Sequence, residues 1–205
     1  MFYNLWCMHL KTIILNIFIM ISSTGFWNID GSKFEKEHAY DAPLSEAIVN
    51  LAKSLGVTKS YDFGCGPGRY TAAFRVAGIE TTGFDGNPIT VSIPNCKVLD
   101  LTSDFNLEPV NFLLSLEVCE HVPKQFEEKL VSNIDKTVKP GGTLVLSWAI
   151  VGQGGFGHVN CQNNPYVINL FTSLGYTYDS ANSNILRKSS SLWWFRNTIM
   201  VFKKN

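Results

Sequence analysis

A glycine-rich segment at residues 62–68, DFGCGPG, is the first part of the sequence whose residue types could do chemistry. Gly64, Gly66 and Gly68 alternate with other residues, and a glycine has no Cβ atom to keep a ligand away from the main chain. The segment is therefore typical of a turn that binds a nucleotide-like ligand. A dinucleotide-binding pattern would carry its third glycine at position 69, which is Arg69 here, so a nicotinamide-dependent reductase is the weakest alternative.

Three aspartates lie at the expected ends of successive strands around this turn. Asp85 follows the turn by about twenty residues, where a carboxylate can accept hydrogen bonds from both ribose hydroxyls. Asp100 can accept from the exocyclic amine of an adenine. Asp62 can orient the turn or receive the ammonium group of a methionine-like tail, which a pyrophosphate-binding turn does not favour. The three carboxylates together predict an adenosine ligand with a cationic tail.

Two glutamates and a histidine in the string EVCEH, residues 117–121, could hold a divalent ion. Glu117, Glu120 and His121 have the spacing i, i+3 and i+4, which places side chains on one face of a helix. His158 lies downstream in the string GGFGHVNC. This mixed set of ligands suits magnesium or manganese, or a softer metal if His158 takes part. In the alternative interpretation, Glu117 borders a cofactor, Glu120 and His121 only begin a helix, and His158 is a loop residue.

The elements that would position these residues alternate between strand-like and helical patterns. Strands are expected at 60–63, 80–84, 95–99, 110–116, 143–148 and 197–202, and helices at 44–55, 71–77, 125–138 and 164–174. The KPGG string at 139–142 is expected to terminate the third of these helices. The alternation predicts one three-layer, doubly wound α/β domain, with a mostly parallel seven-stranded sheet and an antiparallel C-terminal strand.

Composition restricts the function classes. The 205 residues suffice for one α/β domain with a core but not for a second sizeable domain. Lysine plus arginine equals aspartate plus glutamate at 17 each, so the charge disfavours a nucleic-acid partner. The five cysteines are odd in number and form no C-x-x-C pair, which indicates free thiols in a reducing compartment.

Five strings occur in an order and spacing that resemble one family: YDFGCGPGRYT, TGFDGNP, KVLDL, FLLSLEVCEHVP and VKPGGTLVLSW. From Asp41 to Lys203 the chain resembles the class I, Rossmann-like S-adenosylmethionine-dependent methyltransferases. The resemblance implies S-adenosylmethionine as cofactor, bound by Asp62, Gly64, Cys65, Gly66, Gly68, Asp85, Gly86, Asp100, Leu101, Leu116 and Glu117. At position 86 many relatives carry a larger residue than glycine.

The resemblance also implies a reaction. The string E-x-x-E-H resembles the metal-binding set of ubiquinone-pathway O-methyltransferases and of small-RNA 2′-O-methyltransferases, in which a downstream histidine joins it. We therefore expect O-methylation of a small-molecule acceptor, with His121 and His158 as catalytic candidates and Glu117, Glu120 and His121 as candidate metal ligands. The alternatives are a metal-assisted RNA 2′-O-methyltransferase and a non-catalytic methyltransferase-like partner protein.

Three further groups of residues could border the site. The loop GQGGFG at 152–157 is expected to be either a lid or a flexible connection. His38, Tyr40 and Asp41 could cover the cofactor. The aromatic cluster at 193–195, WWF, is expected to be core or interface.

The first thirty residues are expected to form a hydrophobic leader, and residues 31–205 the methyltransferase domain. Thr12 to Ile29 carries no charge and includes the apolar run from Ile13 to Ile21. This pattern fits a signal peptide, a membrane anchor or an extra helix, although polar residues interrupt it. The expected location is cytoplasmic, or secretory or membrane-anchored if the leader is a signal.

Overall fold

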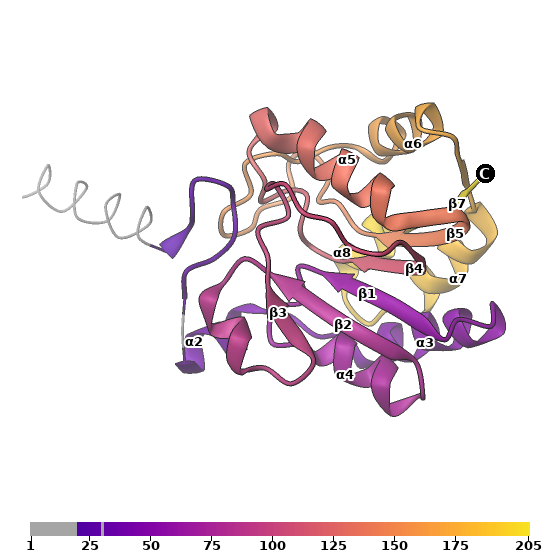
Figure 1. Ribbon diagram of the computed structural model, residues 1–205. Coiled ribbons are helices and arrows are strands. Elements are labelled where there is room, and N and C mark those ends of the chain that lie inside the picture. The colour runs from indigo at the N-terminus through magenta and orange to yellow at the C-terminus, as the bar shows by residue number, and fades with distance from the viewer. Residues whose placement is uncertain (1–19, 30) are drawn as a thin grey trace, which may run out of the picture.

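The computed structural model describes residues 20–29 and 31–205, and its centre is a seven-stranded sheet (Figure 1). The strands are β1 (Lys59–Phe63), β2 (Glu80–Asp85), β3 (Cys96–Val98), β4 (Val110–Ser115), β5 (Val138–Leu146), β6 (Tyr176–Tyr178) and β7 (Met200–Lys204). Their spatial order is β3-β2-β1-β4-β5-β7-β6. Strands β1 to β5 are parallel, and β7 lies antiparallel between β5 and β6. The predicted fold class, including the antiparallel C-terminal strand, is confirmed.

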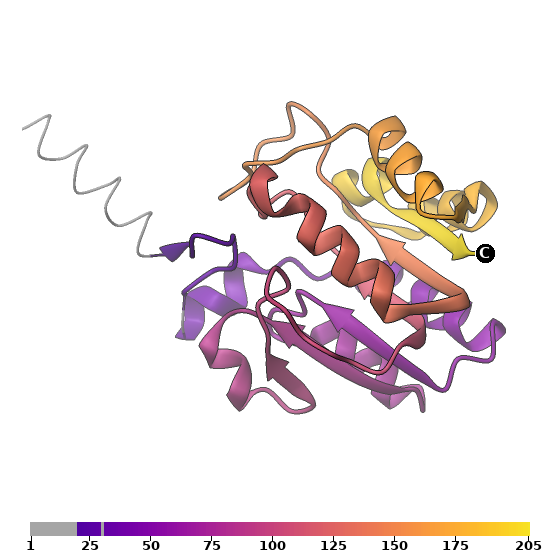
Figure 2. The ribbon, with the colours of Figure 1, turned by 45° about the horizontal axis from the view of Figure 1, so that its top comes forward.

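Helices cover both faces of this sheet (Figure 2). They are α2 (Gly31–Glu37), α3 (Ala42–Ser54), α4 (Arg69–Val76), α5 (Glu127–Thr137), α6 (Asn164–Ser173), α7 (Ser180–Ser189) and α8 (Trp193–Thr198). Helices α5 and α6 bury Leu130, Ile134 and Phe171 in one core, whereas α3, α4, α7 and α8 contribute to the other core, which includes Leu44 and Phe74. The central strand β4 can carry three consecutive buried apolar residues, Phe112 to Leu114, because both of its faces are covered.

Several predicted boundaries were wrong. The KPGG string lies inside β5, which begins at Val138, so it does not form a separate turn after α5. Residues 193–198 form α8, and β7 therefore begins only at Met200. The segment 117–122 is a turn, not the start of a helix, and α5 begins at Glu127 after a 3₁₀ turn over Lys124–Phe126. Pro123 contributes to this delay because the residue before a proline disfavours the helical conformation.

Asp41 has a structural role instead of the predicted place over the cofactor. Its Oδ1 atom accepts a hydrogen bond from the backbone N–H of Leu44, 3.1 Å away, and so caps α3. Its Oδ2 atom accepts from the Ser190 hydroxyl at 2.6 Å and from the N–H of Leu192 at 2.9 Å. Asp41 thus joins α3 to the loop between α7 and α8.

Residues 20–29 fold back on themselves beside the carboxyl ends of the parallel strands (Figure 1). The N–H of Ser22 donates to the Phe26 carbonyl at 2.8 Å, that of Asn28 donates to the Met20 carbonyl at 2.7 Å, and Gly25 turns the chain with φ +105°. We call residues 20–29 the N-terminal strap. Residues 1–19 and 30, with most of the predicted leader, lie outside the described part.

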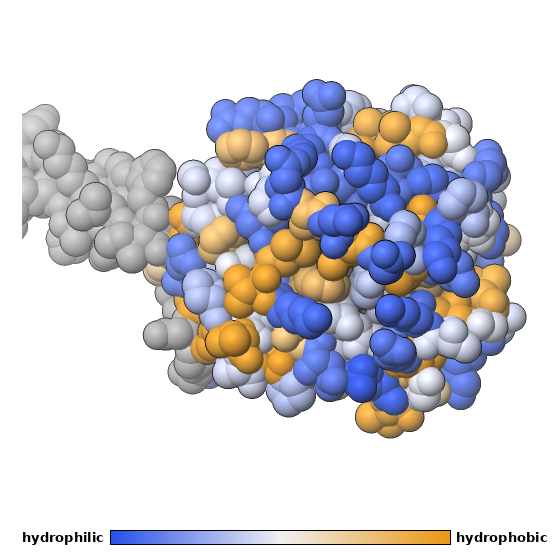
Figure 3. Space-filling model, viewed as in Figure 1, coloured by the Kyte–Doolittle hydropathy of each residue, from blue (hydrophilic) through white to orange (hydrophobic). Residues whose placement is uncertain are grey.

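Neither the strap nor the domain contains a membrane-spanning candidate. Among residues 20–29 and 31–205, every helix is too short or too polar to cross a bilayer. On the face shown in Figure 3, hydrophilic residues cover much of the surface, and hydrophobic patches interrupt them both toward the strap and on the opposite side of the molecule.

Candidate functional site

A cavity of about 390 Å³ opens at the carboxyl ends of the strands. It lies near the point where β1 has β2 on one side and β4 on the other, so that the strand order reverses there. Open α/β sheets bind ligands at this kind of position, and the volume is within the range of small-molecule sites. The walls include the glycine turn, the ends of β2 and β4, the loop at 153–158 and the N-terminal strap.

The glycine turn has a backbone that only glycines adopt without strain. Gly64, Gly66 and Gly68 have φ values of +72°, +48° and +74°. A Cβ atom at Gly64 would lie 2.2 Å from the Val118 side chain, and one at Gly66 would lie 2.4 Å from the His38 ring. Val118 and His38, which also line the cavity, therefore pack directly on the turn, and of the three glycines Gly64 lines the cavity, whereas Gly66 and Gly68 do not. Cys65, between two of the glycines, is buried and also lines the cavity.

Asp85 connects the glycine turn to the end of β2. Its carboxylate accepts hydrogen bonds from the N–H of Gly66 at 3.0 Å and from the N–H of Asn87 at 2.8 Å. Burial raises the pKa of this carboxyl, and the two N–H groups oppose the rise. Asp85 lines the cavity together with Gly86.

Asp62 lies at the end of β1, on the floor of the same cavity. The Thr71 hydroxyl donates a 2.7 Å hydrogen bond to its carboxylate. Burial raises the pKa of Asp62 to about 7, because no cation lies beside it among the described residues to stabilise the charged form. A cationic group entering the cavity would stabilise the ionised carboxylate.

Asp100 borders the opposite side of the cavity after β3. Its Oδ1 atom accepts from the N–H and the hydroxyl of Thr102, at 2.8 and 2.7 Å. Its Oδ2 atom accepts a 2.7 Å hydrogen bond from the hydroxyl of Thr24 in the strap. The apolar neighbours Leu101 and Leu116 are buried in the cavity wall.

Glu117 follows β4 with a positive φ of 55°, which turns its side chain back toward β5. The Ser147 hydroxyl donates to its carboxylate at 2.7 Å and accepts from its N–H at 2.8 Å. Burial raises the pKa of Glu117 to about 7. Glu117 lines the cavity near Leu116 and lies outside the cluster of potential metal ligands described next.

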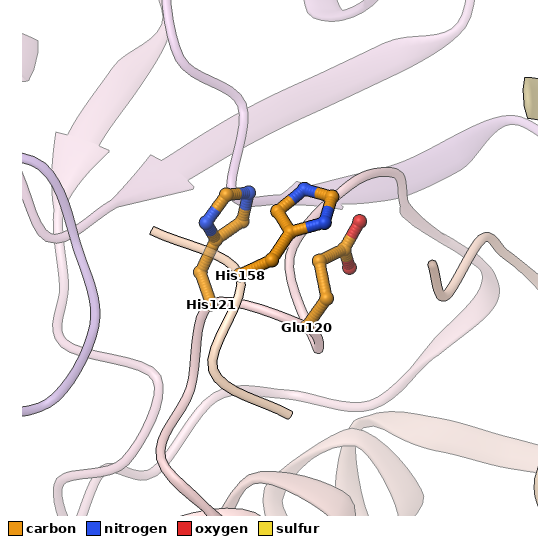
Figure 4. Close-up of side chains that lie close together, drawn as sticks. All are labelled: Glu120, His121 and His158. Carbon is orange, nitrogen blue, oxygen red and sulfur yellow. The ribbon is translucent and has the colours of Figure 1, made fainter. Parts of the chain in front are cut away.

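Glu120, His121 and His158 converge, with one ligand atom from each residue within 4.8 Å of the others. Figure 4 shows the Glu120 carboxylate beside the His158 ring, with the His121 ring on the other side of His158. Within the described part of the chain, neither buried oxygen of Glu120 has a hydrogen-bond partner. Burial, and to a smaller extent the charge of the nearby Glu117, raises the pKa of Glu120 well above its usual range. Burial lowers the pKa of His121 to about 3.

The loop that carries His158 is held against the Glu120 turn by backbone hydrogen bonds. The N–H groups of Val159 and Asn160 both donate to the Glu120 carbonyl at 2.9 Å. The Asn160 side-chain amide donates to the buried Glu127 carboxylate at 2.8 Å, and the Asn160 backbone carbonyl accepts from the Trp148 indole at 2.6 Å. These contacts fix the position of His158 although it lies far from Glu120 in the sequence.

Most of the other residues that the sequence placed near the site also lie at the cavity. His38 and Tyr40 line the cavity, as do Gly154, Gly155 and Phe156 of the glycine-rich loop. All three residues of the aromatic cluster line the cavity. Phe195 is also buried in the core, whereas Trp193 is 56% exposed.

Sequence reasoning missed Thr24, Phe26 and Trp27, which all line the cavity. These residues lie in the uncharged N-terminal stretch and were included in the leader. The aromatic pair directly after Gly25 was the available signal, because a leader does not require two adjacent large aromatic rings.

Comparisons with known proteins agree with this geometry. A model of the methyltransferase domain matches residues 37–181. The ubiquinone biosynthesis O-methyltransferase of Bordetella avium is 29% identical over 134 residues, which cover 59% of this chain and 55% of that protein. The chain therefore matches only about half the length of this relative.

Solved structures share the fold. The 1,6-didemethyltoxoflavin-N1-methyltransferase of Burkholderia thailandensis, with bound S-adenosylhomocysteine, has a TM-score of 0.59 and 16% identity over 85% of this chain and 81% of its own. The magnesium protoporphyrin IX methyltransferase of Synechocystis, with bound S-adenosylmethionine, has a TM-score of 0.62 and 15% identity over 78% of each chain. Because the family model covers more than half of the residues, the chain belongs to the methyltransferase family, and its fold is that of the class I enzymes.

Proposed function

We propose that this methyltransferase uses S-adenosylmethionine to methylate a hydroxyl group of a small molecule. The observation that carries the proposal is the convergence of Asp62, Asp85 and Asp100 with the glycine turn on one cavity. Each carboxylate comes from the end of a different parallel strand, or from just after it. The family match supports the transfer of a methyl group.

The residues of the cavity fit the three parts of the cofactor. Asp85 would bind the ribose hydroxyls, Asp100 the adenine amine, and Asp62 with the glycine turn the cationic methionine part. The buried Asp62 lacks a cationic partner in the described structure, which fits a site made for a positively charged ligand. When bound there, S-adenosylmethionine supplies a methyl group on a sulfonium, a reaction that needs alignment and exclusion of water more than reactive side chains.

The acceptor would lie between His121, His158 and the aromatic rings of the cavity wall. Both histidines face carbonyls with Nδ1, at 3.2 Å from Gly157 and from Gln153, so Nδ1 carries the proton and Nε2 keeps its lone pair. An Nε2 lone pair can accept the proton of a hydroxyl or bind a metal ion. The relative from Bordetella avium, which is named an O-methyltransferase, also supports a hydroxyl acceptor.

A metal-assisted form of the reaction is favoured by the cluster of Glu120, His121 and His158. A carboxylate that is fully buried without a hydrogen-bond partner among the described residues is destabilised, and coordination of a cation would relieve this. The low pKa of His121 keeps its ring neutral, as a ligand must be. Magnesium or manganese held there would lower the pKa of an acceptor hydroxyl.

Calorimetry with S-adenosylhomocysteine tests the cofactor assignment. The wild type should bind, and Asp85→Ala should weaken binding at least tenfold, because a bidentate contact to the ribose is lost. Asp104→Ala is the matched control, since its carboxylate is exposed and pairs only with Lys129 among the described residues. Equal affinity in the wild type and Asp85→Ala would contradict the ribose assignment.

The acceptor is tested with isotope-labelled S-adenosylmethionine and a metabolite extract, followed by mass spectrometry of the labelled product. An O-methyl product of low molecular weight supports the proposal, and an N-methyl or C-methyl product contradicts it. In parallel, label transfer to the 2′-hydroxyl of RNA, with a gel shift at low salt, would favour the RNA methyltransferase instead.

A further inference from the structure

The N-terminal strap reaches the three functional parts of the cavity at once. Thr24 contacts Asp100, Phe26 contacts Gly86, and Trp27 contacts the His121 ring. The strap is anchored at its end by a 2.7 Å hydrogen bond from the Asn87 side chain to the Ile29 carbonyl. It therefore forms a wall of the site, whereas the sequence indicated only a leader.

Phe26 occupies the space beside Gly86 in which a side chain at that position would lie. A Cβ atom built on Gly86 would be 2.3 Å from two carbon atoms of the Phe26 ring and 2.7 Å from its Cβ atom. Gly86 has no positive φ, so its backbone conformation does not require glycine. The requirement for glycine there is steric, and it comes from Phe26.

With Phe26 in this position, an aromatic ring lies next to Asp85, the candidate ribose-binding residue. The cavity is still open with Phe26 in place, and Phe26, Asp85 and Asp100 all line it. A flat apolar ring between a candidate ribose site and a candidate adenine site suits stacking or edge packing against a purine.

The other strap residues lie on either side of Phe26. The Thr24 hydroxyl orients Asp100 through its 2.7 Å hydrogen bond. The Trp27 ring lies 5.0 Å from His38, 5.2 Å from His121 and 5.5 Å from Phe156, measured between centroids. Its indole N–H is buried and has no hydrogen-bond partner within the described residues.

We infer that the N-terminal strap is part of the cofactor site, and that Phe26 supplies the packing surface for adenine that Gly86 does not. This inference rests on the proposed cofactor. The strap has a defined position, because Thr24 holds Asp100 on one side and Trp27 packs between His38 and His121 on the other. A purine entering the cavity would contact the Phe26 ring in place of a side chain at position 86.

Variants that move side-chain volume from position 26 to position 86 test the inference on the full chain. S-adenosylhomocysteine affinity is measured by calorimetry for the wild type, Phe26→Ala, Gly86→Leu and the double variant. Phe26→Ala should bind about tenfold more weakly, the usual effect of removing an aromatic ring from a base. Gly86→Leu should also weaken binding, because its side chain meets Phe26. The double variant should recover most of the affinity, since leucine fills the vacated space.

Val76→Ala is the control, because Val76 is 91% exposed on α4 and lies outside the cavity lining. If Phe26→Ala does not fold, Phe26→Leu gives the measurement, with a smaller loss expected because it keeps apolar volume without the flat face. Unchanged or tighter binding by the Phe26 variants, while the wild type binds normally, would overturn the inference and leave the cofactor assignment intact. Absence of binding by the wild type would instead contradict the proposed function.

Discussion

The ring of His158 lies edge-on against the ring of His121, with the centroids 4.9 Å apart and the planes at 78°. The two residues come from different loops, one after β4 and one after β5. Because each Nδ1 faces a backbone carbonyl, both Nε2 atoms remain available as ligand or base. The first two predictions concern this pair and the neighbouring Glu120.

The cluster should bind a divalent cation. We expect manganese to bind the wild type, as measured by electron paramagnetic resonance of free Mn²⁺, and Glu120→Gln to weaken binding at least tenfold because the charged ligand is lost. The amide has nearly the same shape, so the fold should be retained. Glu128→Gln, an exposed change on α5, is the control and should bind manganese normally. Equal manganese affinity in Glu120→Gln would exclude this cluster as the site.

Asn160 should support the cluster without contacting a metal. Asn160→Ala removes the 2.8 Å hydrogen bond to the buried Glu127, so the free energy of unfolding should fall by about 1–3 kcal/mol. Loosening the His158 loop should also weaken manganese binding about tenfold. S-adenosylhomocysteine affinity should stay the same, because the cofactor candidates lie on other elements. Asn197→Ala, at an exposed asparagine, is the control; if it weakened manganese binding as much, the loop argument would fail.

Asp62 should make the ligand-free protein less stable as the pH rises. Its pKa is about 7 in the folded state against 3.8 in the unfolded state, so the stabilisation is complete below pH 3.8 and is lost as pH rises through 7. The loss is about 1.4 kcal/mol per pH unit over that range. In denaturant titrations, the free energy of unfolding of Asp62→Asn should fall less between pH 5 and pH 7 than that of the wild type. For Asp104→Asn it should fall as much as for the wild type. An identical pH dependence in Asp62→Asn and the wild type would contradict the raised pKa.

Gly66 should tolerate no side chain. Gly66→Ala combines the left-handed backbone, φ +48°, with a contact of 2.4 Å to the His38 ring. Gly56→Ala separates the two effects, because Gly56 has φ +68° but nothing within 4 Å. We expect Gly56→Ala to cost about 1–2 kcal/mol of stability and to leave S-adenosylhomocysteine affinity unchanged. Gly66→Ala should cost more stability and weaken binding at least tenfold; equal effects of the two variants would contradict the close packing described for the turn.

The sequence predicted the central strands and the principal helices well because their patterns are local. The run from Val110 to Ser115 is apolar enough to identify a strand covered on both faces, and the period of α3 is visible in its buried positions. Strand β6 and helix α7 were missed, and the start of β7 was predicted at residue 197 instead of Met200. Strand β6 has three residues, and β7 begins only after α8, so neither boundary has a pattern long enough to detect.

Part of the candidate site could likewise be predicted from the sequence, and part of it could not. The glycine turn and the three aspartates follow strand ends, and parallel strands bring their ends to one edge, so their convergence on the cavity could be expected from the sequence. The predicted helical face of Glu117, Glu120 and His121 did not form, because this segment is a turn. Glu117 turns toward Ser147, whereas His158 joins Glu120 and His121. Their roles in binding and catalysis stay predictions.

The amino-acid sequence by itself determined the α/β fold, the glycine turn and the order of the carboxylates, because periodicity and strand-end residues are local properties. Only the tertiary structure decided which distant residues meet. Phe26 lies on Gly86 and Thr24 on Asp100 because the strap folds back over the sheet edge that carries the cavity. Such contacts depend on the packing of whole elements, and no spacing along the chain encodes them.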